Sequence, residues 1–300
     1  MRYIIDTDPG HDDAMAIMLA IKSGLNIIAV TTVAGNSTIE NTTRNARYIL
    51  NLLDRNDIPV YSGCKKPLKR ELVKAVVHGE SGLEGIDPKN PAGITNNAVA
   101  KILSIIKENE EISLVTLGPL TNIAKAILKD PKTFSRIKEI VIMGGAIKVP
   151  GNKNRVAEFN IFVDPEAADI VFKFPIKKTI IPLDTCNHVK LLLEDFKKIK
   201  GKLSEPLLQM AEPYINNIGE DEGVKAALMY DPLTIYYLIN PNACAIQQFD
   251  VLVETKGLLT RGMTVADLRK KSEKTNLINV VMDINSNKFK NDFIKYLSKD

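Results

Sequence analysis

With 45% hydrophobic and 25% charged residues, this chain of 300 residues has the composition of a soluble globular protein and is long enough to bury a large core. Its 40 basic and 36 acidic residues are nearly balanced and form no long basic block, which argues against nucleic acid as a ligand. No run approaches the roughly 18 apolar residues that cross a bilayer, so the sequence also argues against a membrane protein.

The apolar patterns, taken along the chain, predict alternating strands and helices. The run 3–5 predicts a buried strand, and helical spacing over 14–21 predicts the first helix, with Asp12 or Asp13 as its N-cap. Further strands are predicted over 27–33, 58–61, 112–117, 137–143, 178–183, 249–254 and 278–284. Further helices are predicted over 38–53, 97–107, 120–128, from 165 onward, and over 191–218, 231–239 and 288–297.

Turn and cap residues refine these boundaries. The stretches 62–95 and 146–163 carry glycine or proline without periodicity and are predicted to be irregular. Proline is expected to break the helical stretch 191–218 at Pro206 and Pro213. The expected N-caps are Ser37 or Thr38 for the second helix, and Asp164, followed by Pro165, for a later one.

The alternation of strands and helices predicts the fold class. We expect one doubly wound α/β domain over residues 1–300, with an open, mostly parallel central sheet flanked by helices and ending in antiparallel strands. The stretches 62–95 and 205–230 are expected to form flaps that close over a ligand.

Cysteine usage and the first residues suggest where the protein works. The three cysteines, Cys64, Cys186 and Cys244, are far apart and include no C-x-x-C pair, so a zinc site is not expected. Met1 leads directly into an apolar run, so we expect no targeting segment. Both features predict a protein of the reducing cytoplasm.

Four aspartates, Asp6, Asp8, Asp12 and Asp13, lie within eight positions where the first strand gives way to the first helix. Like charges this close repel by about 1 kcal/mol per pair even in water, and by more when partly buried. Raised pKa values or a bound hard cation would relieve that repulsion, and Pro9-Gly10 provides a turn that gathers the acids. The run alone therefore predicts a site for Ca²⁺ or Mg²⁺, the alternative being a capped helix with solvated acids.

Polar residues also follow other predicted strands. Asn36 follows the second strand, the segment 117–122 follows a later one, 143–145 the next, and Asp231 opens a helix. Because the carboxyl ends of strands in an open sheet meet in one crevice, we expect these residues to gather there.

These motifs resemble those of a known family. The sequence resembles the signature of the calcium-dependent nucleoside hydrolases, the inosine–uridine-preferring ribohydrolase family, over Asp6-Thr7-Asp8-Pro9-Gly10-His11-Asp12-Asp13-Ala14. Further family motifs are matched at 77–83, 117–124, 143–145, 151–152, 157–168 and 260–262, so the resemblance covers nearly the whole chain. It implies a Rossmann-like nucleoside hydrolase fold, Ca²⁺ as cofactor, and a homodimer or homotetramer.

The resemblance also implies roles for individual residues. The metal ligands would be Asp8, Asp13, Asp231 and the backbone carbonyl of Leu117, with Asp6 supporting them. The substrate-binding residues would be Asp12, Asn36, Met143, Asn152, Glu158, Phe159 and Asn160, of which Asp12 and Asn160 hold the ribose diol and Glu158 and Asn152 its 5′-hydroxyl. The catalytic residues would be Asp8 as the base for a Ca²⁺-activated water, with Asn36, His78 and Tyr230.

The implied reaction is hydrolysis of the N-glycosidic bond of ribonucleosides, through an oxocarbenium-like transition state, in nucleoside salvage. An acidic pocket suits the positive charge that develops on the ribose. A water activated by a metal and a carboxylate base would attack the sugar.

Base recognition is where the sequence departs from the family pattern. Many family members carry His before the late metal-binding Asp, and this chain has Tyr230 there. Tyrosine, with an ordinary pKa near ~10, is a poor acid at neutral pH, so Tyr230 is expected to orient or stack on the base. Tyr214, Tyr236 and Phe159 are further aromatic candidates, and base preference stays open. His11 is expected to have a structural role, and His188 none.

Two alternatives remain at this stage. Asp6-Thr7-Asp8 also resembles the start of haloacid-dehalogenase-like phosphatases, with Asp6 as nucleophile and Mg²⁺ as metal, although that pattern gives no use to Asp12 and Asp13. A non-catalytic nucleoside-binding protein on the same fold is the second alternative. Release of phosphate, of ribose or of neither would separate the three.

Overall fold

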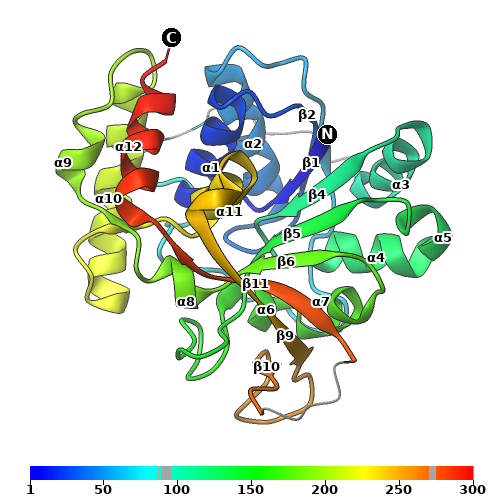
Figure 1. Ribbon diagram of the computed structural model, residues 1–300. Coiled ribbons are helices and arrows are strands. Elements are labelled where there is room, and N and C mark those ends of the chain that lie inside the picture. Colours follow the sequence, from blue (N-terminus) through cyan, green and yellow to red (C-terminus); the bar gives the residue numbers. More distant parts are fainter. Residues whose placement is uncertain (87, 89–95, 270–274, 300) are drawn as a thin grey trace.

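The computed structural model describes residues 1–86, 88, 96–269 and 275–299, which form one large sheet with helices on both faces (Figure 1). In spatial order its nine strands are β10 (Thr264–Ala266), β9 (Cys244–Val253), β11 (Leu277–Ile284), β6 (Lys178–Ile181), β5 (Glu139–Met143), β4 (Ile112–Thr116), β1 (Arg2–Thr7), β2 (Ile27–Thr32) and β3 (Val60–Ser62). A separate two-stranded sheet pairs β7 (Lys190–Leu191) with β8 (Ala227–Leu228).

The pairing is parallel from β3 across to β11 and antiparallel at β9 and β10. The mostly parallel α/β sheet with antiparallel strands at its end is therefore confirmed. The parallel strands are short and apolar on both sides, as expected for strands that helices cover on both faces.

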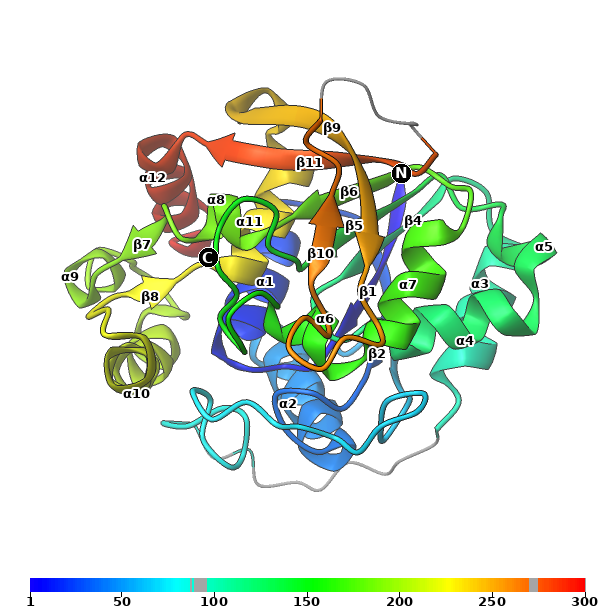
Figure 2. The same cartoon turned by 90° about the horizontal axis from the view of Figure 1, so that it is seen from below.

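Two helix layers cover the sheet, and Figures 1 and 2 show α1 and α12 on one side and α3, α4 and α7 on the other. The first layer holds α1 (His11–Lys22), α2 (Ile39–Leu52), α8 (Leu183–Cys186), α9 (Leu193–Phe196), α10 (Ser204–Glu222), α11 (Tyr230–Ile239) and α12 (Ser286–Leu297). The second holds α3 (Ala98–Glu108), α4 (Thr121–Lys129), α5 (Pro131–Phe134), α6 (Phe159–Val163) and α7 (Pro165–Lys173). Neighbouring residues of β1 serve both layers, since Ile5 packs in the first core and Ile4 in the second.

The start of α1 differs from the sequence prediction. Its N-cap is Gly10, not Asp12 or Asp13, and the carboxylate of Asp13 accepts a hydrogen bond of 2.9 Å from the Gly10 N–H. The helix thus begins at His11, which places both aspartates in its first turn, where the helix dipole favours negative charge. The caps predicted at Thr38 and Asp164 are present.

Helix α10 is continuous, although a break was predicted at each of its prolines. Pro206 lies in the first turn, where a backbone N–H has no partner within the helix, so its absence costs little. Pro213 lies inside the helix and removes the hydrogen bond to the Gln209 carbonyl. Gly85 of the loop after β3 packs so closely on that carbonyl that a Cβ there would overlap it.

Smaller elements were missed because they are short. The stretch 146–163 was predicted to be irregular but ends in α6, and β6 stops at Ile181 because Leu183 begins α8. The irregular loop predicted over 62–95 agrees with the described part up to residue 86, while 87 and 89–95 lie outside the described residues. Among the described helices, none has the length and apolar character needed to cross a membrane.

Candidate active site

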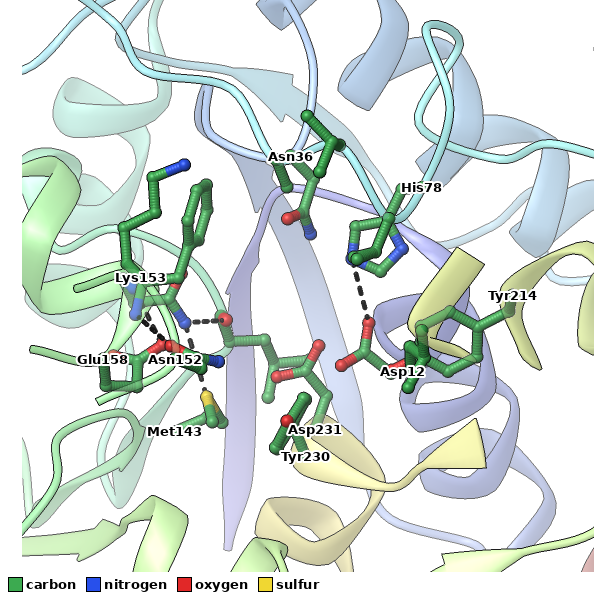
Figure 3. Close-up of a pocket in the computed structure, with 17 residues that line it drawn as sticks. Asp12, Asn36, His78, Met143, Asn152, Lys153, Glu158, Tyr214, Tyr230 and Asp231 are labelled. Carbon is green, nitrogen blue, oxygen red and sulfur yellow. Dashed lines mark hydrogen bonds and ion pairs between the residues drawn. The ribbon is translucent and has the colours of Figure 1, made fainter. Parts of the chain in front are cut away.

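The chain adds β2 and β3 on one side of β1 and β4, β5 and β6 on the other. Such a reversal of strand order leaves a crevice at the carboxyl ends of β1, β2, β4 and β5. A cavity of about 810 Å³ of empty space, its open mouth included, lies there (Figure 3). Of the residues predicted for the site, it is lined by Asp12, Asn36, His78, Leu117, Met143, Asn152, Glu158, Phe159, Asn160, Tyr230 and Asp231.

Asp13 is the most heavily hydrogen-bonded carboxylate of the site. It accepts hydrogen bonds from Thr7 Oγ1 at 2.5 Å, Gly10 N at 2.9 Å, Asn36 Nδ2 at 2.9 Å and Asp8 N at 3.3 Å. These donors come from the end of β1, the β1–α1 turn and the loop between β2 and α2, so two neighbouring strand ends hold the carboxylate in place.

Asp8 is fully buried between two strand ends. Its Oδ2 accepts a hydrogen bond of 2.7 Å from the Asn36 backbone N–H, and its Oδ1 has no hydrogen-bond partner. Gly35 and Gly118 pack on either side, and a Cβ at either position would overlap an Asp8 oxygen. The two glycines therefore make room for this carboxylate.

The carboxylates of Asp12, Asp13 and Asp231 lie together, with oxygens within 4.8 Å of one another, and all three are buried. Burial is the main reason that the pKa values of Asp8, Asp12 and Asp231 are raised well above their usual range. The neighbouring charge of Asp13 raises all three further.

The unpartnered oxygens show what this acidic cluster could hold. Asp8, Asp12 and Asp231 each present a buried Oδ1 without a hydrogen-bond partner among the described residues. A buried carboxylate oxygen without a donor is costly, and a hard cation satisfies such oxygens. The residues therefore fit a metal ion, with Asp8 just outside the three mutually close carboxylates.

Asp6 lies deeper, behind this cluster. Its Oδ1 accepts hydrogen bonds from Thr31 Oγ1 at 2.5 Å and Asn122 Nδ2 at 2.8 Å, and burial raises its pKa to about 7. Asp6 does not line the cavity, and neither do Asp8 and Asp13, which lie just beneath its lining residues Asp12 and Asp231 in the acidic cluster. The supporting role of Asp6 stays a prediction.

Asn160 connects the two sides of the cavity floor. Its Nδ2 donates to the Leu117 carbonyl at 2.7 Å and contacts Met143 Sδ at 3.4 Å. Its side-chain oxygen is then the group it can offer to a ligand, and the Leu117 carbonyl keeps a second lone pair.

Glu158 is the N-cap of α6 and is pinned by the backbone. Its carboxylate accepts hydrogen bonds from the N–H groups of Asn160, Ile161 and Gly145, at 2.8, 3.2 and 3.1 Å. Burial nevertheless raises its pKa to about 7. Asn152 Oδ1 accepts from the Phe159 N–H at 3.0 Å, so its amide N–H groups are the donors it can offer to the cavity.

His78 reaches the cavity from the loop after β3. Its Nε2 lies 3.6 Å from Asp12 Oδ1, and its Nδ1 lies 3.0 Å from His11 Nδ1. The Tyr214 ring of α10 stacks on both imidazoles, with centroids 5.4 Å from His78 and 5.1 Å from His11. Burial lowers the pKa of His11 to about 4 and that of His78 well below its usual range.

The aromatic candidates separate into two groups. Tyr214, Tyr230 and Phe159 line the cavity. Tyr236 does not; its ring packs in the core against Phe289, and its hydroxyl donates to Asp292 at 2.7 Å. Its inclusion was wrong: it follows the cavity-lining Asp231 by five residues in α11, which turns its side chain about 140° away from that of Asp231. His188 is exposed, as expected of a residue without a role.

Several cavity residues were missed by sequence reasoning. Val76, Val77 and Ile218 form an apolar wall, and Lys153 Nζ lies 5.7 Å from the centroid of the Phe159 ring. Figure 3 shows Lys153 on the same side of the cavity as Asn152 and Glu158. Lys153 directly follows Asn152, a predicted site residue, and this adjacency could have indicated that Lys153 lines the cavity. The apolar wall offered none, because such residues are indistinguishable from core residues in a sequence.

Comparisons with known proteins show which family the chain resembles over almost its whole length. A sequence model of the family described as inosine-uridine preferring nucleoside hydrolase matches residues 3–291. The chain is 44% identical over 274 residues to a pyrimidine-specific ribonucleoside hydrolase of Shewanella woodyi, covering 88% of this chain and 87% of that protein. It is 42% identical over 273 residues to a pyrimidine-specific ribonucleoside hydrolase of Escherichia coli, covering 88% of each.

Solved structures give the same result. A plant nucleoside hydrolase superposes with a TM-score of 0.92 at 32% identity, covering 100% of this chain and 99% of that one. A purine-preferring ribonucleoside hydrolase from Gardnerella vaginalis superposes with a TM-score of 0.90 at 29% identity, covering 99% and 98%.

Proposed function

This chain belongs to the inosine-uridine preferring nucleoside hydrolase family, hydrolyses ribonucleosides to ribose and free base, and, we propose, prefers pyrimidine ribonucleosides. The observation that carries the preference is its 42–44% identity to proteins named as pyrimidine-specific, compared with 29% to a purine-preferring one. The chain-wide match leaves no support for the phosphatase alternative.

The proposed cofactor is Ca²⁺, held by Asp8, Asp13, Asp231 and the Leu117 carbonyl. The all-oxygen donor set supports a hard cation, and the unpartnered oxygens of Asp8 and Asp231 support their part in it. When bound, the ion would supply positive charge that acidifies a nearby water and attracts vicinal hydroxyl groups.

We assign the role of base to Asp8. In the hydrolysis, a water oxygen bonds to the anomeric carbon while the C–N bond breaks, and one proton of the water must leave. Asp8 Oδ1 is buried and has no donor of its own, so it is available to take that proton. The Asn36 N–H fixes the second oxygen of Asp8, while the Asn36 side chain fixes Asp13.

The sugar is held by the polar floor. Asp12 and the side-chain oxygen of Asn160 are placed to accept hydrogen bonds from the 2′- and 3′-hydroxyls, and Met143 to pack on the ring. Asn152 and Glu158 are assigned to the 5′-hydroxyl. The carboxylates around the sugar favour the positive charge that grows on it as the bond to the base breaks.

The base is assigned to the opposite side of the cavity, between His78, Tyr214, Tyr230 and the apolar wall. Phe159 is assigned to the sugar side, because it follows Glu158 directly as the first residue of α6. The tyrosine rings can stack on a planar base, and apolar walls exclude water from the departing anion. The single-domain reading, a homodimer or homotetramer, and a cytoplasmic location stay predictions.

The test is a panel of uridine, cytidine, inosine and adenosine with a reducing-sugar readout. We expect ribose release from the pyrimidine ribosides at least about tenfold faster than from the purine ribosides. Chelation should abolish ribose release, and added Ca²⁺ should restore it. The Asp13→Ala variant should release ribose several orders of magnitude more slowly than the native enzyme, while the control Asp57→Ala, at an exposed position, should keep the native rate. Faster purine hydrolysis would refute the base preference, and full activity in chelator would refute the metal assignment.

A further inference from the structure

The side-chain amide of Asn45 joins two segments that are far apart in the chain. Asn45 lies in α2 and is fully buried, and its Nδ2 donates to the Pro9 carbonyl and to the Ser81 carbonyl, each at 3.0 Å. Both partners are carbonyls, which only accept, so the amide nitrogen and not the amide oxygen faces them. That nitrogen carries two hydrogens, and the two contacts use both of them.

The first contact leads to a proposed ligand of the metal. The Pro9 carbonyl and the Gly10 N–H belong to the same planar peptide unit and point in opposite directions. The Gly10 N–H donates to Asp13 Oδ2 at 2.9 Å. A donor on the Pro9 carbonyl therefore fixes the plane of this unit with its N–H aimed at Asp13. It also polarises the unit, which strengthens the hydrogen bond to the carboxylate.

The second contact leads to the loop on the base side of the cavity. This base-side loop, residues 76–86, carries His78 into the cavity lining and passes Asn45 at Ser81. The next residue, Gly82, has a φ of +79°, and a Cβ there would lie 3.2 Å from Asn45 Nδ2. The base-side loop therefore packs directly on α2, with room for glycine at this point.

Two other side chains near the start of α2 hold the base-side loop but not the β1–α1 turn. Ser37 Oγ donates to the Glu80 carbonyl at 2.8 Å, and Asn41 Nδ2 donates to Ser37 Oγ at 2.9 Å and to the same carbonyl at 3.2 Å. Within the described part of the chain, neither side chain hydrogen-bonds to residues 8–13. Asn41 lies one helical turn before Asn45 on the same face of α2, so it is a matched comparison.

We propose that Asn45 is a positioning residue that fixes the metal-binding half and the base-binding half of the cavity relative to each other. It holds Asp13 through the Pro9–Gly10 peptide. It holds the base-side loop through Ser81. Hydrolysis requires that a sugar bound in the first half presents its C–N bond to the second, and a misplacement of about 1 Å can cost about 100-fold in rate. The inference rests on the proposed function for the identity of the metal and the substrate.

Hydrogen–deuterium exchange read by mass spectrometry tests the link directly and needs no substrate. In Asn45→Ala, the segments 7–14 and 76–86 should both exchange about tenfold faster than in the native enzyme, because each loses a buried hydrogen bond. In Asn41→Ala, only the segment 76–86 should exchange faster. Native exchange of the segment 7–14 in Asn45→Ala would overturn the proposal.

Ca²⁺ affinity and kinetics test the consequence for the site. Asn45→Ala should bind Ca²⁺ about 10- to 100-fold more weakly, measured by competition with a fluorescent chelator, because groups that orient a metal ligand change affinity by that factor. At saturating Ca²⁺, its kcat for uridine should fall about 100-fold while KM changes less. Asn41→Ala should keep the native Ca²⁺ affinity and kcat. A lower Tm in Asn45→Ala with native Ca²⁺ affinity and kcat would reduce Asn45 to a structural residue.

A second variant keeps the proposal testable if Asn45→Ala does not fold. Asn45→Ser leaves room for one water, which would bond to the new hydroxyl and to the carbonyls of Pro9 and Ser81. It should fold and show faster exchange in the same two segments, with smaller increases than the alanine variant. Native exchange in both segments, together with native Ca²⁺ affinity, would refute the role of Asn45.

The result can be separated from a failure of the proposed function. If the native enzyme bound no Ca²⁺ and released no ribose, while Asn45→Ala opened both segments, the proposed function would fail and the positioning role would stand. If the native enzyme released ribose in a Ca²⁺-dependent way, while the segment 7–14 exchanged at the native rate in Asn45→Ala, the reverse would hold.

Discussion

Gly118→Ala perturbs the position of the proposed base without changing any functional group. Gly118 follows Leu117 at the end of β4, and a Cβ there would overlap Asp8 Oδ1 and lie 2.8 Å from Asp8 Cγ. Carbon atoms in contact prefer about 3.8 Å, so the carboxylate or the strand end has to move by about 1 Å. The other side is closed as well, because Gly35 packs there and the Asn36 N–H holds Asp8 Oδ2 at 2.7 Å.

The size of the effect follows from that displacement. A misplacement of about 1 Å in a catalytic group can cost about 100-fold in rate, which corresponds to about 2.7 kcal/mol in the activation free energy. Overpacking a buried site also costs about 1–3 kcal/mol of stability. We therefore expect Gly118→Ala to remain folded, with a modestly lower Tm and with kcat/KM for uridine reduced about 100-fold.

The assay compares initial rates of ribose release with thermal unfolding of the same samples. Gly219→Ala is the matched control, because the nearest atoms to a Cβ there are 3.9 Å away and alanine suits a helix. Its rate and Tm should stay close to those of the native enzyme. A Gly118→Ala enzyme with native kcat/KM would show that the exact position of Asp8 does not matter, and the assignment of Asp8 as base would have to be abandoned.

Two further predictions concern Glu158 and Tyr230. Burial raises the pKa of Glu158 from its ordinary 4.5 to about 7, so between these values the folded chain keeps a proton that the unfolded chain has lost, and stability falls as pH rises. The Tm of the chelated enzyme should therefore fall between pH 5 and 8, less steeply in Glu158→Gln; equal slopes would contradict this. Tyr230→Phe should lower the rates for uridine, cytidine and inosine by unequal factors, because Tyr230 is proposed to lie beside the base; rates equal to those of the native enzyme for all three would reduce Tyr230 to a packing residue.

Much of the fold was predictable because its parallel strands are short apolar runs with turn residues after them. The sequence also predicted that Asp12, Asn36 and Asp231 gather in one crevice, since this follows from the strand ends alone. The cap at Asp164 was predictable from local spacing, because a cap and its helix are neighbours in the chain.

What the sequence could not predict depends on contacts between distant segments. The number of donors on each acid is one such feature, since Asp13 accepts four hydrogen bonds while Asp8 keeps one oxygen without a donor, although both belong to one motif. The contacts of the His11 ring are another, since its Nε2 lies 2.9 Å from the Glu84 carbonyl oxygen and its Nδ1 lies 3.0 Å from His78 Nδ1. His11 lies 67 residues from His78 in the chain, and nothing in the spacing of either residue indicates which nitrogens meet.

The antiparallel end of the sheet also serves the site, which explains why the fold extends beyond the parallel strands that carry the acids. Thr264 of β10 accepts a hydrogen bond of 2.8 Å from the Ala146 N–H and donates one of 2.7 Å to the Ala146 carbonyl. Asp184 accepts from the N–H groups of Ile147 and Lys148, each at 2.8 Å. The loop after β5 therefore has its backbone groups satisfied from two distant segments, and it cannot relax without breaking several buried hydrogen bonds. Because that loop follows Met143, the edge strand fixes the wall of the cavity against which the ribose is proposed to pack.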